Sequence, residues 1–211
     1  MSNRARVLGR RRPGAQNPAL IGPNAVLQAV AVMEERLGHA ETAAILADAR
    51  ITRLPSGEHM IPEVDALRLH RWLALHDPMG ALVIAEESGA RTADYIIANR
   101  IPRIAAKLLR HLPAALAAPL LMAAIRKHAW TFIGAGNFAP DGAWRFAIDR
   151  SAADDPVPPP DSLFLWYAAV FTRLFRALVA GDCECRMIEP EQGGTDGRAL
   201  FESAVKALVS A

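Results

Sequence analysis

Aromatic rings and glycines alternate along residues 128–149, and these residue types could together hold a flat organic ligand. The Pro-Asp-Gly sequence in the middle favours a short turn between two strands, so the stretch predicts a β-hairpin. A turn centred on Asp141 would place Phe138 opposite Trp144, with every second side chain on one face. That face would carry Trp130, Phe132, Gly134, Gly136, Phe138, Trp144, Phe146 and Ile148.

Two interpretations of this aromatic face stay open. Large rings are usually buried, which favours a core packed under helices, with the glycines covered by rings from the opposite strand. Alternatively, the glycines let a ligand approach the sheet while the flanking rings stack on it. We expect a mixture, in which some rings are buried and others line a pocket.

His128 stands where an alanine-rich helix is expected to meet the first aromatic strand. A neutral imidazole there could be an axial ligand to a bound metal. Near a helix C-terminus, a histidine more often interacts favourably with the helix dipole, and this second role is the favoured one.

The sequence contains no complete motif for binding a redox cofactor. Residues 134–139 match the dinucleotide fingerprint G-x-G-x-x-A, but they run into a turn and a strand instead of a helix that could hold a pyrophosphate. There is no P-loop, and Cys183 and Cys185 are too few for an iron–sulfur cluster. We interpret these two as buried or edge thiols, and expect no intrinsically bound cofactor.

Composition predicts a globular chain whose small net charge provides no general electrostatic attraction for nucleic acid. The 211 residues are 52% hydrophobic, and 24 basic against 22 acidic residues give a net charge of +2. The sequence contains no stretch long and apolar enough for a transmembrane segment and no secretory signal, and its few cysteines favour a cytoplasmic location. Arginines cluster in residues 1–20, which predicts a disordered basic tail that is solubilising or that contacts an acidic partner or anionic lipid at a membrane periphery.

The rest of the chain predicts one α+β domain over residues 21–211, with helices packed on a small antiparallel sheet. Its helical part spans 21–128, with two short helices at 79–87 and 92–100 separated by Gly89. The hairpin follows at 129–150, then a proline-rich linker at 151–160, a long helix buried on two sides, and a strand at 183–188. Residues 198–209 fit either a strand or a helix.

Four separated motifs resemble one known family. They are IGPN at residues 21–24, MIPE at 60–63, TADYIIANRIP at 92–102 and HAWTFIGAGNF at 128–138. Together they resemble the bacteriochlorophyll 4-vinyl reductase family, over roughly residues 20–190. The resemblance implies a 4-vinyl reductase domain, a ligand-binding α+β fold similar to vesicle-tethering and haem-based nitric oxide sensor domains.

The resemblance also implies a role in photosynthesis, at the reduction of the 8-vinyl (old 4-vinyl) group of a divinyl chlorophyllide precursor. Because no reductant site is visible, we expect a protein that binds or delivers magnesium-porphyrin or chlorophyllide pigment. The alternatives are the reductase itself, with an external electron donor, and an assembly protein. The candidate ligand-binding residues are the face residues Trp130, Phe132, Gly134, Gly136, Phe138, Trp144 and Phe146, with Tyr95 and Arg100 added and His128 as a candidate magnesium ligand. Expected partners are the pigment, other enzymes of bacteriochlorophyll biosynthesis and a second copy of the chain.

Overall fold

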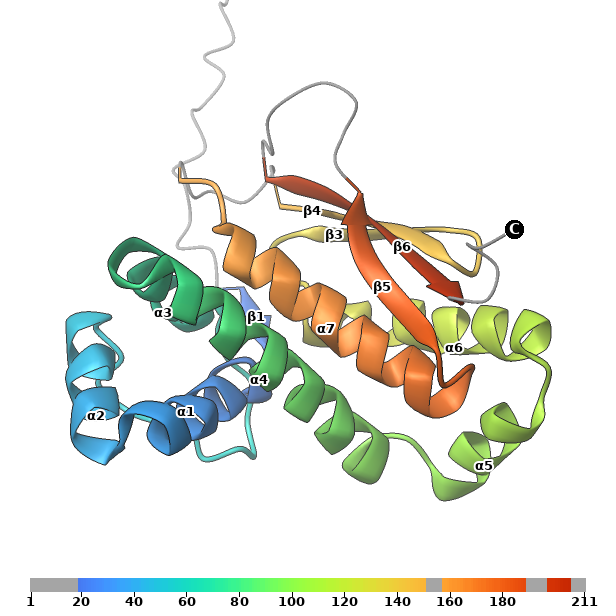
Figure 1. Ribbon diagram of the computed structural model, residues 1–211, viewed down its shortest axis with the longest axis horizontal. Helices are drawn as coiled ribbons and strands as arrows, with labels where there is room; N and C mark the ends of the chain where they lie inside the picture. Colours follow the sequence, from blue (N-terminus) through green and yellow to red (C-terminus); the bar gives the residue numbers. More distant parts are fainter. Residues whose placement is uncertain (1–18, 151–156, 189–196, 206–211) are drawn as a thin grey trace, which may run out of the picture.

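The computed structural model describes residues 19–150, 157–188 and 197–205 (Figure 1). It is an α+β structure with two antiparallel sheets, which confirms the expected fold class. The helices are α1 Asn24–Leu37, α2 His39–Asp48, α3 Glu63–His76, α4 Pro78–Asn99, α5 Arg103–His111, α6 Ala114–His128, the 3₁₀ turn η1 Ala129–Thr131, and α7 Asp161–Leu178. The strands are β1 Leu20–Ile21, β2 Ile61–Pro62, β3 Asn137–Asp141, β4 Arg145–Asp149, β5 Cys183–Ile188 and β6 Arg198–Val205.

The larger sheet has the strand order β3-β4-β6-β5. Its central strand β6 settles the ambiguous C-terminal segment as a strand, because Ala199, Phe201 and Ser203 are buried in the alternation that a half-buried strand requires. The expected tail reaches slightly too far, since Leu20 already pairs with Pro62 in the smaller sheet. The remaining tail, most of the linker and residues 206–209 lie outside the described residues.

The hairpin is shorter than expected, and its predicted register was wrong. Trp130 lies in η1, and the first strand begins only at Asn137. Phe138 pairs with Ile148 instead of Trp144, and the loop runs from Gly142, whose φ is +75°, to Trp144. The proline of the turn sequence lies inside β3, where an edge strand tolerates its missing N–H. The partner of Phe138 therefore shifts by four residues, and because this number is even the aromatic face keeps its members in this part.

Helix α7 lies between the larger sheet and α4 (Figure 1), and it is buried on two sides as expected. On the sheet side, the Phe171 ring stacks on Phe146, with centroids 4.0 Å apart, and Phe146 stacks on Phe201 at 4.8 Å. These rings form the centre of the hydrophobic core.

On its other side, α7 packs closely against α4. A Cβ on Gly89 would lie 2.6 Å from the Trp166 carbonyl oxygen and 2.8 Å from the Ala169 Cβ. The expected break at Gly89 is absent because α4 is one continuous helix. The glycine is retained in mid-helix because it allows the two backbones to approach. No helix of the described residues is both long and apolar enough to cross a bilayer.

Candidate ligand-binding groove

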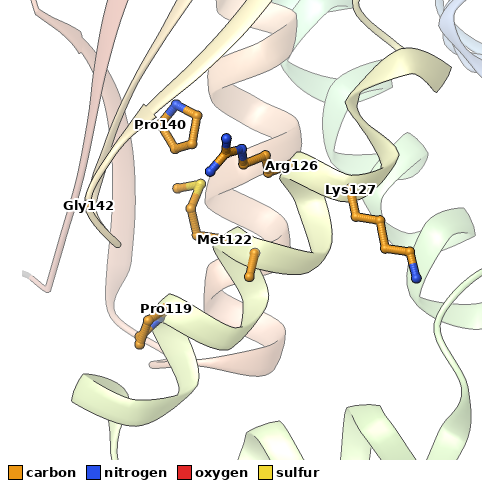
Figure 2. Close-up of a pocket in the computed structure, with 7 residues that line it drawn as sticks. Pro119, Met122, Arg126, Lys127, Pro140 and Gly142 are labelled. Atoms are coloured by element: carbon orange, nitrogen blue, oxygen red, sulfur yellow. The ribbon is translucent and has the colours of Figure 1, made fainter.

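An open groove of about 650 Å³ lies between α6 and the tip of the β3–β4 hairpin (Figure 2). Both of its walls come from the region where the sequence places the helix-to-hairpin transition. It is lined by Pro119, Met122, Ala123, Arg126, Lys127, Pro140 and Gly142.

Helix α6 presents this lining because its two sides differ. Leu121 and Ile125 point into the core with the small residues Ala117 and Ala118. Met122 is also buried, at 3% exposed, but it lines the groove together with the exposed Arg126 one turn later. Pro119 lies within the continuous helix and does not divide it. The groove therefore has a mostly apolar floor with basic residues at one end.

The two cations of the groove are oriented differently. The Arg126 side chain points towards Met122 and Pro140, whereas Lys127 points away from them along the outer side of α6 (Figure 2). Both side chains are exposed, and within the described part of the chain neither forms an ion pair. Arg126 is therefore available to an anionic group that enters the groove.

None of the residues expected from the sequence to bind ligand lines this groove. Phe138 and Phe146 are 8% and 1% exposed and lie in the core, and Trp144 contacts the Phe175 ring. Phe132 is half-buried among Phe138, Tyr167 and Phe171. Phe138 and Phe146 are closed to a ligand in this structure, whereas Phe132 and Trp144 are partly exposed, and the role of all four rings in binding stays a prediction.

The other expected ligand residues lie nearer the surface. Trp130 is 64% exposed in η1, just beyond α6. Arg100 lies at the end of α4, where its guanidinium is 6.0 Å from the centre of the Tyr95 ring. His128 is exposed at the end of α6, so its imidazole is free to contact a ligand, although no structural contact tests that role.

The two glycine gaps of the hairpin segment are filled by the chain itself. Gly134 has a φ of +57°, and a Cβ there would lie 2.2 Å from the Glu63 carboxyl carbon. A Cβ on Gly136 would lie 2.8 Å from the Asp149 carbonyl oxygen. These glycines are therefore required for the close approach of protein groups.

A buried ion pair between Glu63 and Arg150 organises this region, with side-chain exposures of 8% and 2%. The Glu63 carboxylate also accepts a hydrogen bond from the Ala135 amide at 2.9 Å, and Arg150 donates to the Ile133 carbonyl at 3.3 Å. The Tyr167 hydroxyl donates to the Phe132 carbonyl at 2.9 Å, and burial raises the pKa of Tyr167, so this donor stays neutral. The side chains of Glu63 in α3, Tyr167 in α7 and Arg150 just after β4 thus fix the turn at residues 132–135.

The four sequence motifs meet at this junction. The Gly22 amide donates to the Thr131 carbonyl at 2.7 Å, and β1 and β2 pair Ile21 with Ile61. The Thr92 hydroxyl lies 3.4 Å from the Asn24 carbonyl oxygen. We call this set, with Glu63 and Arg150, the motif junction. Sequence reasoning missed it, and the available signal was a glutamate placed directly after Pro62 at the start of a helix.

A second buried polar pair links α3 to α7. The His70 Nδ1 lies 3.1 Å from the Ser162 hydroxyl, and both residues are buried. Burial lowers the pKa of His70 from 6.5 to about 4, so its imidazole is neutral at neutral pH.

The two cysteines are buried in β5. Burial raises the pKa of Cys183 to about 11 and that of Cys185 to about 12, so both stay protonated thiols. Over the described residues, no group of three or more His, Cys, Asp and Glu side chains is placed to hold a metal ion.

The fold places the chain in a known structural class. It matches the Fe(II) unliganded H-NOX protein of K. algicida with a TM-score of 0.56 at 11% identity, over 90% of this chain and all of that one. It matches an H-NOX mutant of T. tengcongensis with a TM-score of 0.53 at 10% identity, over 88% and 98% of the two chains. The fold is therefore H-NOX-like, and these matches do not support the finer name of a 4-vinyl reductase fold.

Sequence relatives identify the family. The chain is 42% identical over 163 residues to the bacteriochlorophyll synthase 23 kDa chain of Cereibacter sphaeroides, over 75% of this chain and 78% of that protein. It is 41% identical over 161 residues to the same protein of Rhodobacter capsulatus, over 75% of each. No family model matches. The chain belongs to the bacteriochlorophyll synthase 23 kDa chain family, which confirms the expected biosynthetic family, although these relatives are not named 4-vinyl reductase.

Proposed function

We propose that this protein binds a magnesium tetrapyrrole of bacteriochlorophyll biosynthesis in the groove between α6 and the hairpin, and delivers it to another enzyme. The groove itself carries the proposal, because it combines an apolar floor with the unpaired Arg126. Two findings support it: the relatives are chains of a bacteriochlorophyll synthase, and one of the H-NOX structures with the same fold probes the function of haem distortion in that family.

The chemistry of the ligand suits the groove. A tetrapyrrole is a flat apolar macrocycle with carboxylate side groups, so Met122 and Pro140 would contact the ring while Arg126 pairs with a carboxylate. The volume of about 650 Å³ is of the order that small-molecule sites have. The open side would leave one edge of the pigment accessible, as delivery to a second protein requires.

A titration of the full-length protein with divinyl protochlorophyllide, with and without NADPH, tests this function. Binding and delivery predict a shift of the Soret band that NADPH does not alter, with the vinyl group intact. The absence of a shift at micromolar pigment would contradict the proposal.

A reductase that takes electrons from a separate donor is the second candidate, and the motivation is the expected position of the family at the 8-vinyl step. It predicts loss of the vinyl group when a donor is added to the same titration. A pure assembly role within the synthase predicts neither change, and co-purification with the other chains would then support it.

His128 remains the candidate axial ligand to the pigment magnesium, because its exposed imidazole follows the groove cation Lys127. If it coordinates the metal, His128→Ala lowers the affinity for the magnesium pigment more than the affinity for the metal-free analogue. A folded variant with an unchanged ratio of the two affinities would remove it as a ligand.

A further inference from the structure

Helix α5 is amphipathic, and its outer face is unusually apolar. Ala106 and Leu109 point into the core, whereas Ile104 and Leu108, one turn apart on the opposite side, are 85% and 56% exposed. Figure 1 shows α5 at the periphery, beyond the end of α4 and away from the larger sheet. The side chain of Arg110 donates to the Ala177 carbonyl at 3.1 Å, which ties this helix to the end of α7.

The segment of sequence that contains α5 carries charge of one sign. Residues 95–140 contain six lysines and arginines and no acidic residue, so all 22 acidic residues lie elsewhere in the chain. Arg103 and Lys107 are exposed beside the apolar pair, and within the described residues neither forms an ion pair. The face therefore presents apolar side chains with uncompensated positive charge.

Exposure of apolar groups alone does not single out this face. Leu75 and Met79 are 77% and 72% exposed, but they flank Asp77 in a region of mixed charge. A second copy of the chain is a poor occupant of the α5 face, because a symmetric contact would bring the basic residues of two copies together with no carboxylate from this segment between them.

We propose that the outer face of α5 docks on an anionic lipid bilayer surface. Ile104 and Leu108 would enter the interface between head groups and acyl chains, while Arg103 and Lys107 extend along it to the phosphates. This attachment is peripheral and does not depend on the proposed pigment site.

Flotation of the full-length protein with phosphatidylglycerol vesicles, and separately with phosphatidylcholine vesicles, tests the proposal. We expect binding to phosphatidylglycerol that salt weakens, and little binding to phosphatidylcholine. Ile104→Ser with Leu108→Ser should weaken binding at least about tenfold, because both side chains would leave the interface. Arg103→Glu with Lys107→Glu should weaken it as well.

The matched controls keep the same chemistry at other exposed sites. Leu75→Ser with Met79→Ser, and Arg50→Glu with Arg53→Glu, should bind as the wild type does. The N-terminal basic residues are unchanged in every variant. If the α5 variants bind as tightly as the wild type, lipid binding comes from those N-terminal residues and the proposal is overturned. Failure of the wild type to bind phosphatidylglycerol would also overturn it, as would a dimer that the α5 substitutions dissociate without any binding to vesicles.

Discussion

The motif junction holds the turn between α6 and the hairpin, whereas the groove lies between α6 and the hairpin tip, and the polar groups of the two regions are in opposite states. In the junction, Glu63 and Arg150 are buried and bonded to each other and to the backbone. In the groove, Arg126 is exposed and has no carboxylate partner among the described residues. The first arrangement stabilises the fold, whereas the second leaves a charge available for a ligand.

This difference changes what the sequence motifs signify. The four motifs that point to the family meet in the closed region, so they report how the chain holds the turn at residues 132–135. None of the residues that line the groove lies in those motifs. A motif that identifies a family therefore need not mark the place where the family binds its ligand.

The largest effect is expected from separating the buried pair. Arg150→Met leaves the Glu63 carboxylate buried without its partner, and we expect a loss of about 3 to 5 kcal/mol in the free energy of unfolding. Urea unfolding measures it. The matched control is Arg145→Met at the other end of β4, where the exposed pair with Glu202 should contribute less than about 1 kcal/mol. Equal losses of unfolding free energy in the two variants would show that the buried pair contributes no more than an exposed one.

Two glycines with positive φ allow a second comparison. Gly142→Ala meets no atom within 4 Å and should cost only the left-handed backbone strain, about 1 to 2 kcal/mol. Gly134→Ala adds a collision with the Glu63 carboxylate, so we expect roughly 1 to 3 kcal/mol more from the disturbed buried bonds. Thermal unfolding of the two variants tests whether the Glu63 carboxylate needs a residue without a Cβ at position 134. Similar losses of stability in the two variants would contradict this requirement.

The buried His70 should make the stability of the protein depend on pH. Its pKa is about 4 when folded and about 6.5 when unfolded, so below pH 6.5 the unfolded chain takes up a proton that the folded chain does not. Stability should therefore fall by roughly 3 kcal/mol from this group as the pH drops from 6.5 to 4. His70→Gln should flatten that part of the profile. Parallel profiles for the wild type and His70→Gln would contradict the assignment.

Several parts of the fold follow from local patterns. The bounds of β5, the long buried α7 and the α+β class could be predicted, because periodicity and breakers act over short distances. The aromatic face was predicted correctly for Phe138, Phe146 and Ile148, but its register was not, because an edge strand accepts Pro140.

Neither the motif junction nor the groove could be predicted well from the sequence, because both depend on contacts between distant parts of the chain. Glu63 and Arg150 are 87 positions apart, and nothing local to either residue indicates its partner. The groove likewise forms between two elements, so its lining depends on how α6 approaches the hairpin. The lining residues at positions 119, 122, 123 and 126 do share helical spacing, and this pattern was the available signal.

The affinity of the Arg126→Glu variant for divinyl protochlorophyllide, followed by the Soret shift, tests the central claim most directly. If a pigment carboxylate pairs with Arg126, affinity should fall at least about tenfold, because a charge-assisted hydrogen bond becomes a repulsion. Lys127→Glu is the matched control, since its side chain points away from the groove floor, and it should have the smaller effect (Figure 2). Both variants should unfold within about 0.5 kcal/mol of the wild type, as exposed positions do. A folded Arg126→Glu variant that binds the pigment as tightly as the wild type would contradict the groove as the binding site.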